Sequence, residues 1–397
     1  MSSTISSSKT AFSFNDLPLS CKLLLMFSFI ESIGGSIAYH IAYFFSVSSD
    51  FNRLDIGILG FVMGIGALLG SLYGGYVSGK IPAKKLIGTS FLLMGFAFVC
   101  LAKINSFPLT VVLVALTGFG INLFLTCNNS TLLLLSKENH YSLTMAQSFK
   151  NAMENAGGIV AMVLIMFLAQ HYFKSTLFSI GLAFVFVGVY TWLRFDIKSQ
   201  CVEPGLLKKE KTVETVYGRL LPLLFSVFCI GLTYGIQKTV LGVHLNETIN
   251  NSFIIGFFFA TDSILITLFQ VKLSRRMERF NPHIIACLGC LLLGASTFAL
   301  ALSATGMQMF CSLGFFTLGE MLFMPHSVTL CHRYGGSNHS GLGVGAWRSA
   351  YALGMMFGPL ISGIAMHYFS AQSAWTMSSL LCLFSAYLVL SAAKKNG

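Results

Sequence analysis

The chain has 397 residues, of which 55% are hydrophobic and only 10% are charged. About a quarter of the residues of a soluble domain are charged, so these few charges cannot cover a globule of this size with a solvated surface. The composition therefore excludes an ordinary soluble domain and predicts an integral membrane protein whose outer surface faces hydrocarbon.

The net charge of +11 and the ten cysteines do not point to nucleic acid or metal. The basic residues lie in short gaps between apolar runs, and most cysteines lie inside those runs as small apolar side chains. Cys287 and Cys290 form a CxxC pair, but within an expected spanning helix. We also find no nucleotide-binding loop and no nucleophile constellation. We expect no enzyme activity, no cofactor, no metal and no nucleic-acid partner.

Apolar runs of about 20 residues predict twelve membrane-spanning helices in two sets of six. The first set is expected at 21–47, 54–78, 86–103, 108–134, 145–170 and 175–195. The second set is expected at 219–243, 251–273, 283–303, 306–332, 341–368 and 371–392. The predicted fold class is therefore an all-α membrane protein.

The longest polar stretch divides the chain into two similar halves. We expect an N-terminal tail over 1–20, a six-helix bundle over 21–195, a linker over 196–218, a second six-helix bundle over 219–392 and a short tail over 393–397. Such an arrangement predicts two pseudo-symmetric bundles.

Short sequence matches support that symmetry. Residues 25–29 match 223–227, and 149–152 match 347–350, with the same offset of 198 positions. One register that holds across half the chain is a sign of repeated transporter halves.

The lysines and arginines of the short loops lie almost all on one side of this twelve-helix arrangement. The other side has only Arg53, Lys103 and Lys174. Positively charged loops remain cytoplasmic, so both termini and the linker are expected in the cytoplasm. Short loops and tails favour a bacterial inner membrane, and we expect a monomer.

The loop after the second span carries a recognisable pattern. Residues 75–85 read Gly-Tyr-Val-Ser-Gly-Lys-Ile-Pro-Ala-Lys-Lys. They resemble the signature loop of the major facilitator superfamily, in particular its twelve-helix drug and metabolite proton antiporters. The first glycine and all three cations are kept, but Gly79 replaces the acid and Pro82 replaces the second glycine.

The resemblance extends to residues with expected gating or structural roles. In the superfamily, cytoplasmic loops join the two halves through charge pairs, and glycine and proline shape the tenth and eleventh helices. Merely setting the topology is an equal alternative for the loop cations. The residues concerned are Gly75, Lys80, Lys84, Lys85, Glu154, Arg275, Arg276, Arg279, Pro325, Gly358 and Pro359.

Two departures from the antiporter pattern bear on the direction of transport. Many proton antiporters carry a basic residue in the fourth helix, where this chain has Ala115. The Gly-Pro signature of the fifth helix is also absent, since Gly157 and Gly158 are followed by no proline.

Ionisable residues inside the spans are the candidates for function, because each is costly in hydrocarbon unless it is paired or wet. The superfamily resemblance implies that helices one, four, seven and ten line a central cavity. Glu31, Glu320 and Asp262 are the proton-coupling candidates, since a carboxyl group beside an apolar cavity can load and release a proton. A static salt bridge is the alternative for each.

The substrate-binding candidates are the embedded cations and polar groups Lys150, Arg348, Lys238, Asn122 and His40. Lys150 and Arg348 are equivalent in the repeat, and together they can bind a carboxylate or phosphate. Lys150 also lies four residues before Glu154, so a structural ion pair is its default role.

We therefore expect a secondary transporter that uses protons to export a small organic molecule by alternating access. A drug-like compound and a carboxylate-rich metabolite such as a siderophore both fit. Proton-coupled uptake of a metabolite is the alternative, and a non-transporting receptor or assembly factor of the same fold is an alternative of another class.

Overall fold

The computed structural model describes residues 17–40, 51–77, 80–104, 106–138, 143–194, 213–249, 251–277, 279–334 and 340–394. These residues form eleven α-helices. They are α1 (Leu19–Tyr39), α3 (Arg53–Val77), α4 (Ala83–Leu101), α5 (Phe107–Glu138), α6 (Leu143–Arg194), α7 (Val213–Ile249), α8 (Ser252–Met277), α9 (Pro282–Leu302), α10 (Gly306–Tyr334), α11 (Ser340–Tyr368) and α12 (Ala371–Lys394).

Helix α6 contains two spans, because its backbone leaves the helical conformation at Tyr172. The limb before Tyr172 packs against α1 and α8, and the limb after it packs against α4. With α6 counted as two limbs, the eleven helices give twelve helical segments where the sequence predicts twelve spans. Eleven of these segments in the described chain, including the limb of α6 after Tyr172, are long and apolar enough to cross a membrane.

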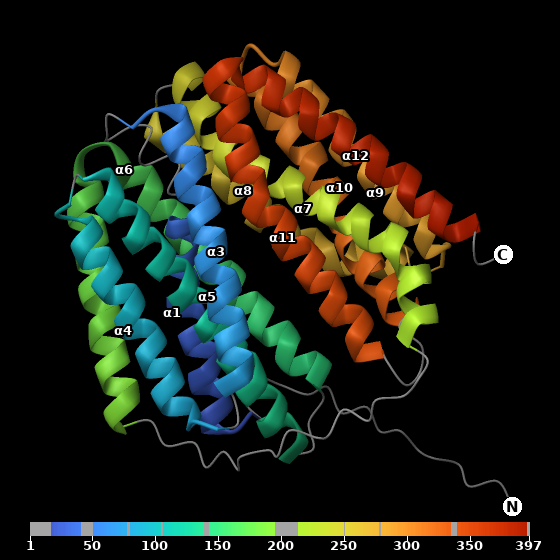
Figure 1. Ribbon diagram of the computed structural model, residues 1–397. Helices are drawn as coiled ribbons and strands as arrows, with labels where there is room; N and C mark the ends of the chain where they lie inside the picture. Colours follow the sequence, from blue (N-terminus) through green and yellow to red (C-terminus); the bar gives the residue numbers. More distant parts are fainter. Residues whose placement is uncertain are drawn as a thin grey trace, which may run out of the picture.

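The helices group into two bundles of six spans (Figure 1). Helices α1 and α3–α6 form the N-terminal bundle, and α7–α12 form the C-terminal bundle. Adding 198 to the residue numbers of α3 gives 251–275, which nearly coincides with the bounds of α8, 252–277. The same displacement of α4 gives 281–299, against 282–302 for α9. The repeat found in the sequence is thus a repeat of helices.

Helix α7 begins at Val213, six residues before the expected start of the seventh span. Hydropathy marks the length of helix inside hydrocarbon, whereas the hydrogen-bonded backbone continues into the polar region. Residues 213–218 of the expected linker are therefore helical, while 196–212 lie outside the described residues. The expected end of the first span, 41–47, also lies outside them.

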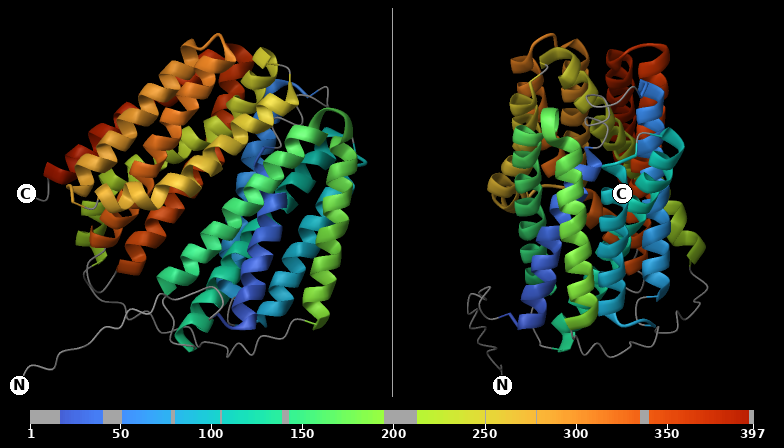
Figure 2. Two further views of the ribbon diagram at one scale, coloured as in Figure 1. Left: turned by 180° about the vertical axis from the view of Figure 1, so that it is seen from behind. Right: turned by 90° about the vertical axis from the view of Figure 1, so that its left-hand side faces the viewer.

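The bundles meet at one end and diverge toward the other. We call the end where α1 begins and α3 ends the linker end, and the opposite end the far end. In Figure 1, α3 and α11 lie side by side at the far end and separate toward the linker end. From behind, α6 (green) and α8 (gold) meet in the same way (Figure 2).

Glycines allow this contact. Gly57 faces the backbone of Gly363, Gly60 faces the ring of Pro359, and Gly64 faces Met356. Small residues at such positions let two helix backbones approach closely in a membrane. The two bundles are therefore joined by backbone packing between α3 and α11.

Arg53 adds polar contacts at the far end. Its Nη2 lies 2.6 Å from Glu247 Oε1 of α7, and its Nη1 donates to the Met366 carbonyl oxygen of α11 at 3.2 Å. Asn52 and Asp55 fix the start of α3, since each side chain accepts a hydrogen bond from the other's backbone N–H. One of the few cations on this side thus bridges the two bundles.

The Gly57 contact gives a testable prediction. A Cβ at Gly57 would lie 2.7 Å from both Gly363 Cα and the Pro359 carbonyl oxygen, which are backbone atoms that cannot rotate away. We expect Gly57→Ala to cost about 1–3 kcal/mol at this contact and to move the bundles apart at the far end. Spin labels at Lys103 and Met307, which lie beside this end, would report a longer and broader distance.

The matched control is Gly314→Ala, because a Cβ at Gly314 meets nothing within 4 Å. It should leave the distance distribution unchanged. Equal distributions for wild type and Gly57→Ala would show that this packing does not hold the far end closed.

Candidate functional site

Two adjoining cavities lie between the bundles. The larger, about 890 Å³, is lined by α1, α3, α5, α7 and α11. The smaller, about 310 Å³, is lined by α1, α5, α6 and α11. Tyr39, Asn129 and Arg348 line both. The expected lining by spans one, four and seven is present in α1, α5 and α7, whereas α3 and α11 take the place expected for the tenth span.

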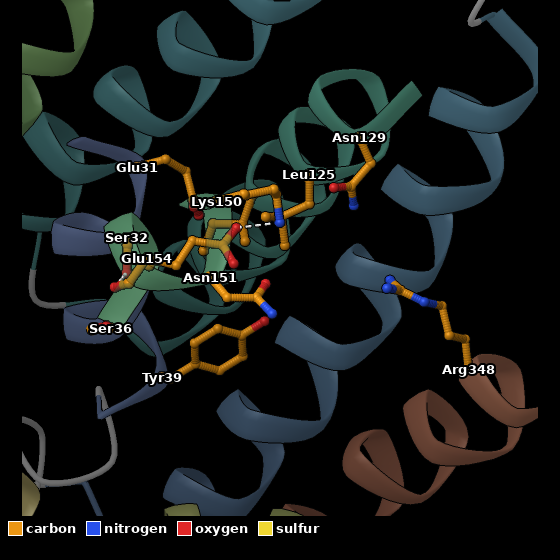
Figure 3. A pocket seen from close by; sticks show the side chains of 12 residues that line it. Glu31, Ser32, Ser36, Tyr39, Leu125, Asn129, Lys150, Asn151, Glu154 and Arg348 are labelled. Atoms are coloured by element: carbon orange, nitrogen blue, oxygen red, sulfur yellow. Dashed lines mark hydrogen bonds and ion pairs between the residues drawn. The ribbon is translucent and has the colours of Figure 1, made fainter. Parts of the chain in front are cut away.

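One face of α1 forms the wall of the smaller cavity. Glu31, Ser32, Gly35, Ser36 and Tyr39 follow one another at helical spacing and all line it. Because positions three and four residues apart share a helix face, these residues form one largely polar stripe along α1. Glu31 is only 2% exposed, and its carboxyl group is aimed at α6 (Figure 3).

Lys150 and Glu154 of α6 form an ion pair beside Glu31. The Lys150 Nζ lies 2.5 Å from Glu154 Oε1, with the side chains 6% and 26% exposed. Both groups interact electrostatically with Glu31. Gly157 brings α6 against the α1 backbone at this level, and Ser32 Oγ donates to the Glu154 carbonyl oxygen. The i, i+4 ion pair expected from the sequence is confirmed.

The larger cavity is lined by two cations, Lys238 of α7 and Arg348 of α11, and by no acid among the described residues. Lys238 interacts electrostatically with Glu320 behind the wall. Arg348 lies across the cavity from Glu31, Lys150 and Glu154 (Figure 3). No ion pair joins it to any residue that the structure describes.

A second group of charges lies inside the C-terminal bundle. Glu320 of α10 interacts with Asp262 of α8 and with Lys238. Thr317 Oγ1 donates to Asp262 Oδ1 at 2.8 Å, and Tyr234 lies against Glu320. Within the described part of the chain, Glu320 Oε2 and the Tyr234 hydroxyl are buried without a hydrogen-bond partner. Three residues singled out separately in the sequence therefore form one cluster.

The polar candidates Asn122 and His40 lie in different surroundings. Asn122 lines the larger cavity, and Ser71 Oγ donates to its Oδ1 at 3.5 Å. His40 is buried, its Nδ1 donates to the Ser36 carbonyl oxygen at 2.8 Å, and its ring lies 4.3 Å from that of Phe259. His40 thus packs one bundle against the other and lines neither of these cavities.

The gating candidates divide by location. Gly358 packs on the α7 backbone and Pro359 on α3, so this pair lies where α3, α7 and α11 meet. At the linker end, Gly75 faces open space and the Lys80 ammonium lies 3.5 Å from the centre of the Tyr76 ring. Lys84 is half-buried, Lys85, Arg276 and Arg279 are exposed, Pro325 is half-buried within α10, and the side chain of Arg275 lies outside the described residues.

Sequence reasoning missed the aromatic side chains of the cavity. Tyr39, Trp347 and Tyr351 line it, and the rings of Trp347 and Tyr351 stack at 5.4 Å. Tyr351 also lies 5.7 Å from Tyr234, which links the cavity to the buried cluster. Tyr39 could have been found by extending the Glu31 stripe by two helical turns.

The match to known proteins decides the family. Residues 23–216 and 223–396 match the Major Facilitator Superfamily. The chain belongs to this superfamily. It is 22% identical over 379 residues to the uncharacterized MFS-type transporter YttB of Bacillus subtilis (strain 168), in a match that covers 93% of this chain and 94% of YttB.

Solved structures share the MFS fold. The nucleoside transporter NupG matches with a TM-score of 0.79 and 14% identity, over 95% of this chain and 100% of that one. The peptide transporter POT in complex with sulfate matches with a TM-score of 0.77 and 11% identity, over 97% of this chain and 96% of that one. The family match and the apolar helices together make the chain a multi-pass membrane protein of the MFS transporter type. The drug and metabolite antiporter group remains a prediction.

The Lys150–Glu154 pair gives a second prediction. Removing one partner of a fully buried pair costs about 3–5 kcal/mol. Because Glu154 is 26% exposed, we expect Glu154→Gln to lower the free energy of unfolding by about 2 kcal/mol. The double variant Lys150→Gln/Glu154→Gln should recover part of this loss. Both are measured by denaturant unfolding in detergent.

Glu247→Gln is the matched control, because it removes the same charge from the exposed pair with Arg53. It should cost less than about 1 kcal/mol. Equal losses for the two Glu→Gln variants would contradict the assignment of Lys150–Glu154 as a structural pair.

Proposed function

We propose that this transporter couples the movement of protons to that of a small organic molecule. The observation that carries the proposal is Glu31, a buried carboxyl group that lines a cavity between the two bundles beside an ion pair. Intramembrane ionisable groups that line a cavity mark substrate and ion pathways.

Each bundle holds two carboxyl groups and one ammonium group at its charged cluster. The N-terminal cluster is Glu31, Glu154 and Lys150, and the C-terminal one is Glu320, Asp262 and Lys238. With both acids ionised, such a cluster carries a net charge of −1, which low-dielectric surroundings disfavour. Uptake of one proton makes it neutral. Each cluster therefore supports a one-proton change.

Alternating access connects that change to transport. The bundles contact at the far end through Gly57 and Arg53 and diverge toward the linker end. Rocking of the bundles would close the linker end and open the far end around the same cavity. While the cavity is closed to both sides, a neutral cluster has a lower free-energy cost than a charged one.

We propose export as the direction, into the medium from the cytoplasm of a bacterial cell. The resemblance of residues 75–85 to the drug and metabolite antiporter loop supports it, with a drug-like compound or a carboxylate-rich metabolite as cargo. The cation-rich linker end supports a cytoplasmic placement of both termini.

Uptake by proton symport is the second candidate, and the packing of α5 favours it. The Ala115 carbonyl oxygen lies against Gly66 of α3, so the two backbones are in contact where many antiporters place a base. Gly157 and Gly158 likewise serve close packing of α6 against α1 and α8.

The test is internal pH in proteoliposomes given gradients of a panel of drug-like compounds and carboxylate-rich metabolites. Wild-type protein should move protons whenever a transported compound moves. The protons should move opposite to the compound if the protein is an antiporter and in the same direction if it is a symporter. Glu31→Gln should move fewer protons per compound than wild type, because the amide cannot ionise and only the C-terminal cluster still binds a proton. Glu320→Gln should reduce the number of protons moved per compound.

Glu247→Gln removes an acid from the far-end pair with Arg53 and away from both clusters, so it should change the rate of transport but not the number of protons moved per compound. Proton movement that is unchanged in Glu31→Gln would return Glu31 to a structural role. Compound movement without protons in wild type would make the protein a facilitator. A wild-type protein that moves neither would support the receptor or assembly-factor alternative.

A further inference from the structure

The two bundles differ at one pair of equivalent positions. In the N-terminal bundle, Lys150 is paired with Glu154 four residues later. In the C-terminal bundle, 198 positions on, Arg348 stands for Lys150 but Ala352 stands for Glu154. The acid that would neutralise Arg348 from its own helix face is therefore missing.

We propose that Arg348 binds the anionic head group of the substrate, and that the substrate class is amphipathic organic monoanions. This inference rests on the proposed transport function and adds the chemistry of its cargo. Arg348 and Ala352 both line the larger cavity, so the space left by the missing carboxylate opens onto the guanidinium group.

The surrounding charges single out Arg348. Lys150 is neutralised by Glu154, and Lys238 interacts with Glu320 behind the cavity wall. Glu31 interacts with Lys150 and Glu154 at the other side of the smaller cavity. Among these three cations, Arg348 is the one for which the described chain shows neither an ion pair nor an electrostatic interaction with an acid, since Glu31 and Glu154 lie across the smaller cavity from it. A cation without a partner in a partly dehydrated cavity attracts one anion.

The chemistry of arginine narrows the head group. The guanidinium group presents a planar fork of donors that matches a carboxylate, sulfonate or phosphate with two parallel hydrogen bonds. Lys150 lines the same smaller cavity, but its charge is neutralised by Glu154. One head group with one negative charge is therefore enough to neutralise Arg348.

The walls around Arg348 narrow the rest of the molecule. Trp347 and Tyr351 stack beside it, and Met63, Met355 and Met356 complete an apolar side. Methionine side chains adapt to apolar bodies of different shape. A volume of about 890 Å³ falls within the range of roughly 300–1,000 Å³ of small-molecule sites. The cavity thus fits an aromatic or aliphatic body attached to a single anionic end.

The test measures binding to the purified full-length protein in detergent, where no proton gradient exists. The probes share one body and differ in charge: 4-phenylbutyrate, 4-phenylbutanamide and 4-phenylbutylamine, with 1-naphthaleneacetate and 1-naphthalenesulfonate as larger anions. We expect the anions to raise the melting temperature of wild type in a saturable way and the amide and amine to do so weakly. Arg348→Gln should weaken anion binding roughly ten- to a hundredfold.

Ala352→Glu is the sharper variant, because it rebuilds opposite Arg348 the i, i+4 pair that Lys150 has. It should lose anion binding as Arg348→Gln does, while Ala352→Gln, of the same size and uncharged, should retain it. Arg348→Lys keeps the positive charge but loses the planar fork of donors, so it should bind anions with an affinity between those of wild type and Arg348→Gln. It also controls for folding, because a cation is still present at this position.

Three outcomes would overturn the proposal: no stabilisation of wild type by any of the anions, equal stabilisation by amide and carboxylate, or equal losses in Ala352→Glu and Ala352→Gln. Because binding needs no coupling, anion binding that survives in a protein without proton movement would reject the proton mechanism and keep the Arg348 site. Proton coupling in a protein that binds the amide as well as the anions would keep the proton mechanism and reject the Arg348 site.

Discussion

The cost of charge inside hydrocarbon is the constraint on which this structure depends. A buried ionised group is tolerated only with a partner of opposite charge or with access to water. The N-terminal bundle meets this requirement with Lys150–Glu154, and the C-terminal bundle groups Asp262, Glu320 and Lys238. Helices α1 and α6 of the N-terminal cluster line the smaller cavity, and Lys238 of the C-terminal cluster lines the larger one. The need to balance charge thus places the ionisable groups where a permeating molecule passes.

Helix packing serves the same arrangement. Glycines of α3 meet the backbone of α11, and Gly256 of α8 meets Met166 of α6. These contacts are confined to one end, which leaves room between the bundles at the level of Arg348 and Lys238. The small residues thus allow close backbone contact at the far end. Their confinement to that end leaves the cavity open between the far end and the linker end.

Much of the fold was predictable because membrane helices leave a strong signal in hydropathy. The twelve spans and the offset of 198 follow from apolar length and from short repeats, and the Lys150–Glu154 pair follows from helical spacing alone. The start of α7 at Val213 was not predictable, since a helix can extend beyond the hydrocarbon.

The cavity itself was predicted less well. Hydropathy does not say which face of a uniformly apolar helix points inward, so the lining by α3 and α11 and the burial of His40 against Phe259 required three-dimensional packing. The loss of the acid at Ala352 was visible in the repeat, but its meaning depends on seeing that the position faces the cavity.

The bridge formed by Arg53 has a consequence for the environment of the transporter. Its pair with Glu247 is 42% and 41% exposed, so dissolved ions reach it, whereas Glu31 is only 2% exposed. Screening over about 8 Å at physiological ionic strength weakens exposed pairs far more than buried ones. The balance between open and closed far ends is thereby tied to the salinity of the compartment on that side of the membrane, while the interior chemistry is insulated from it.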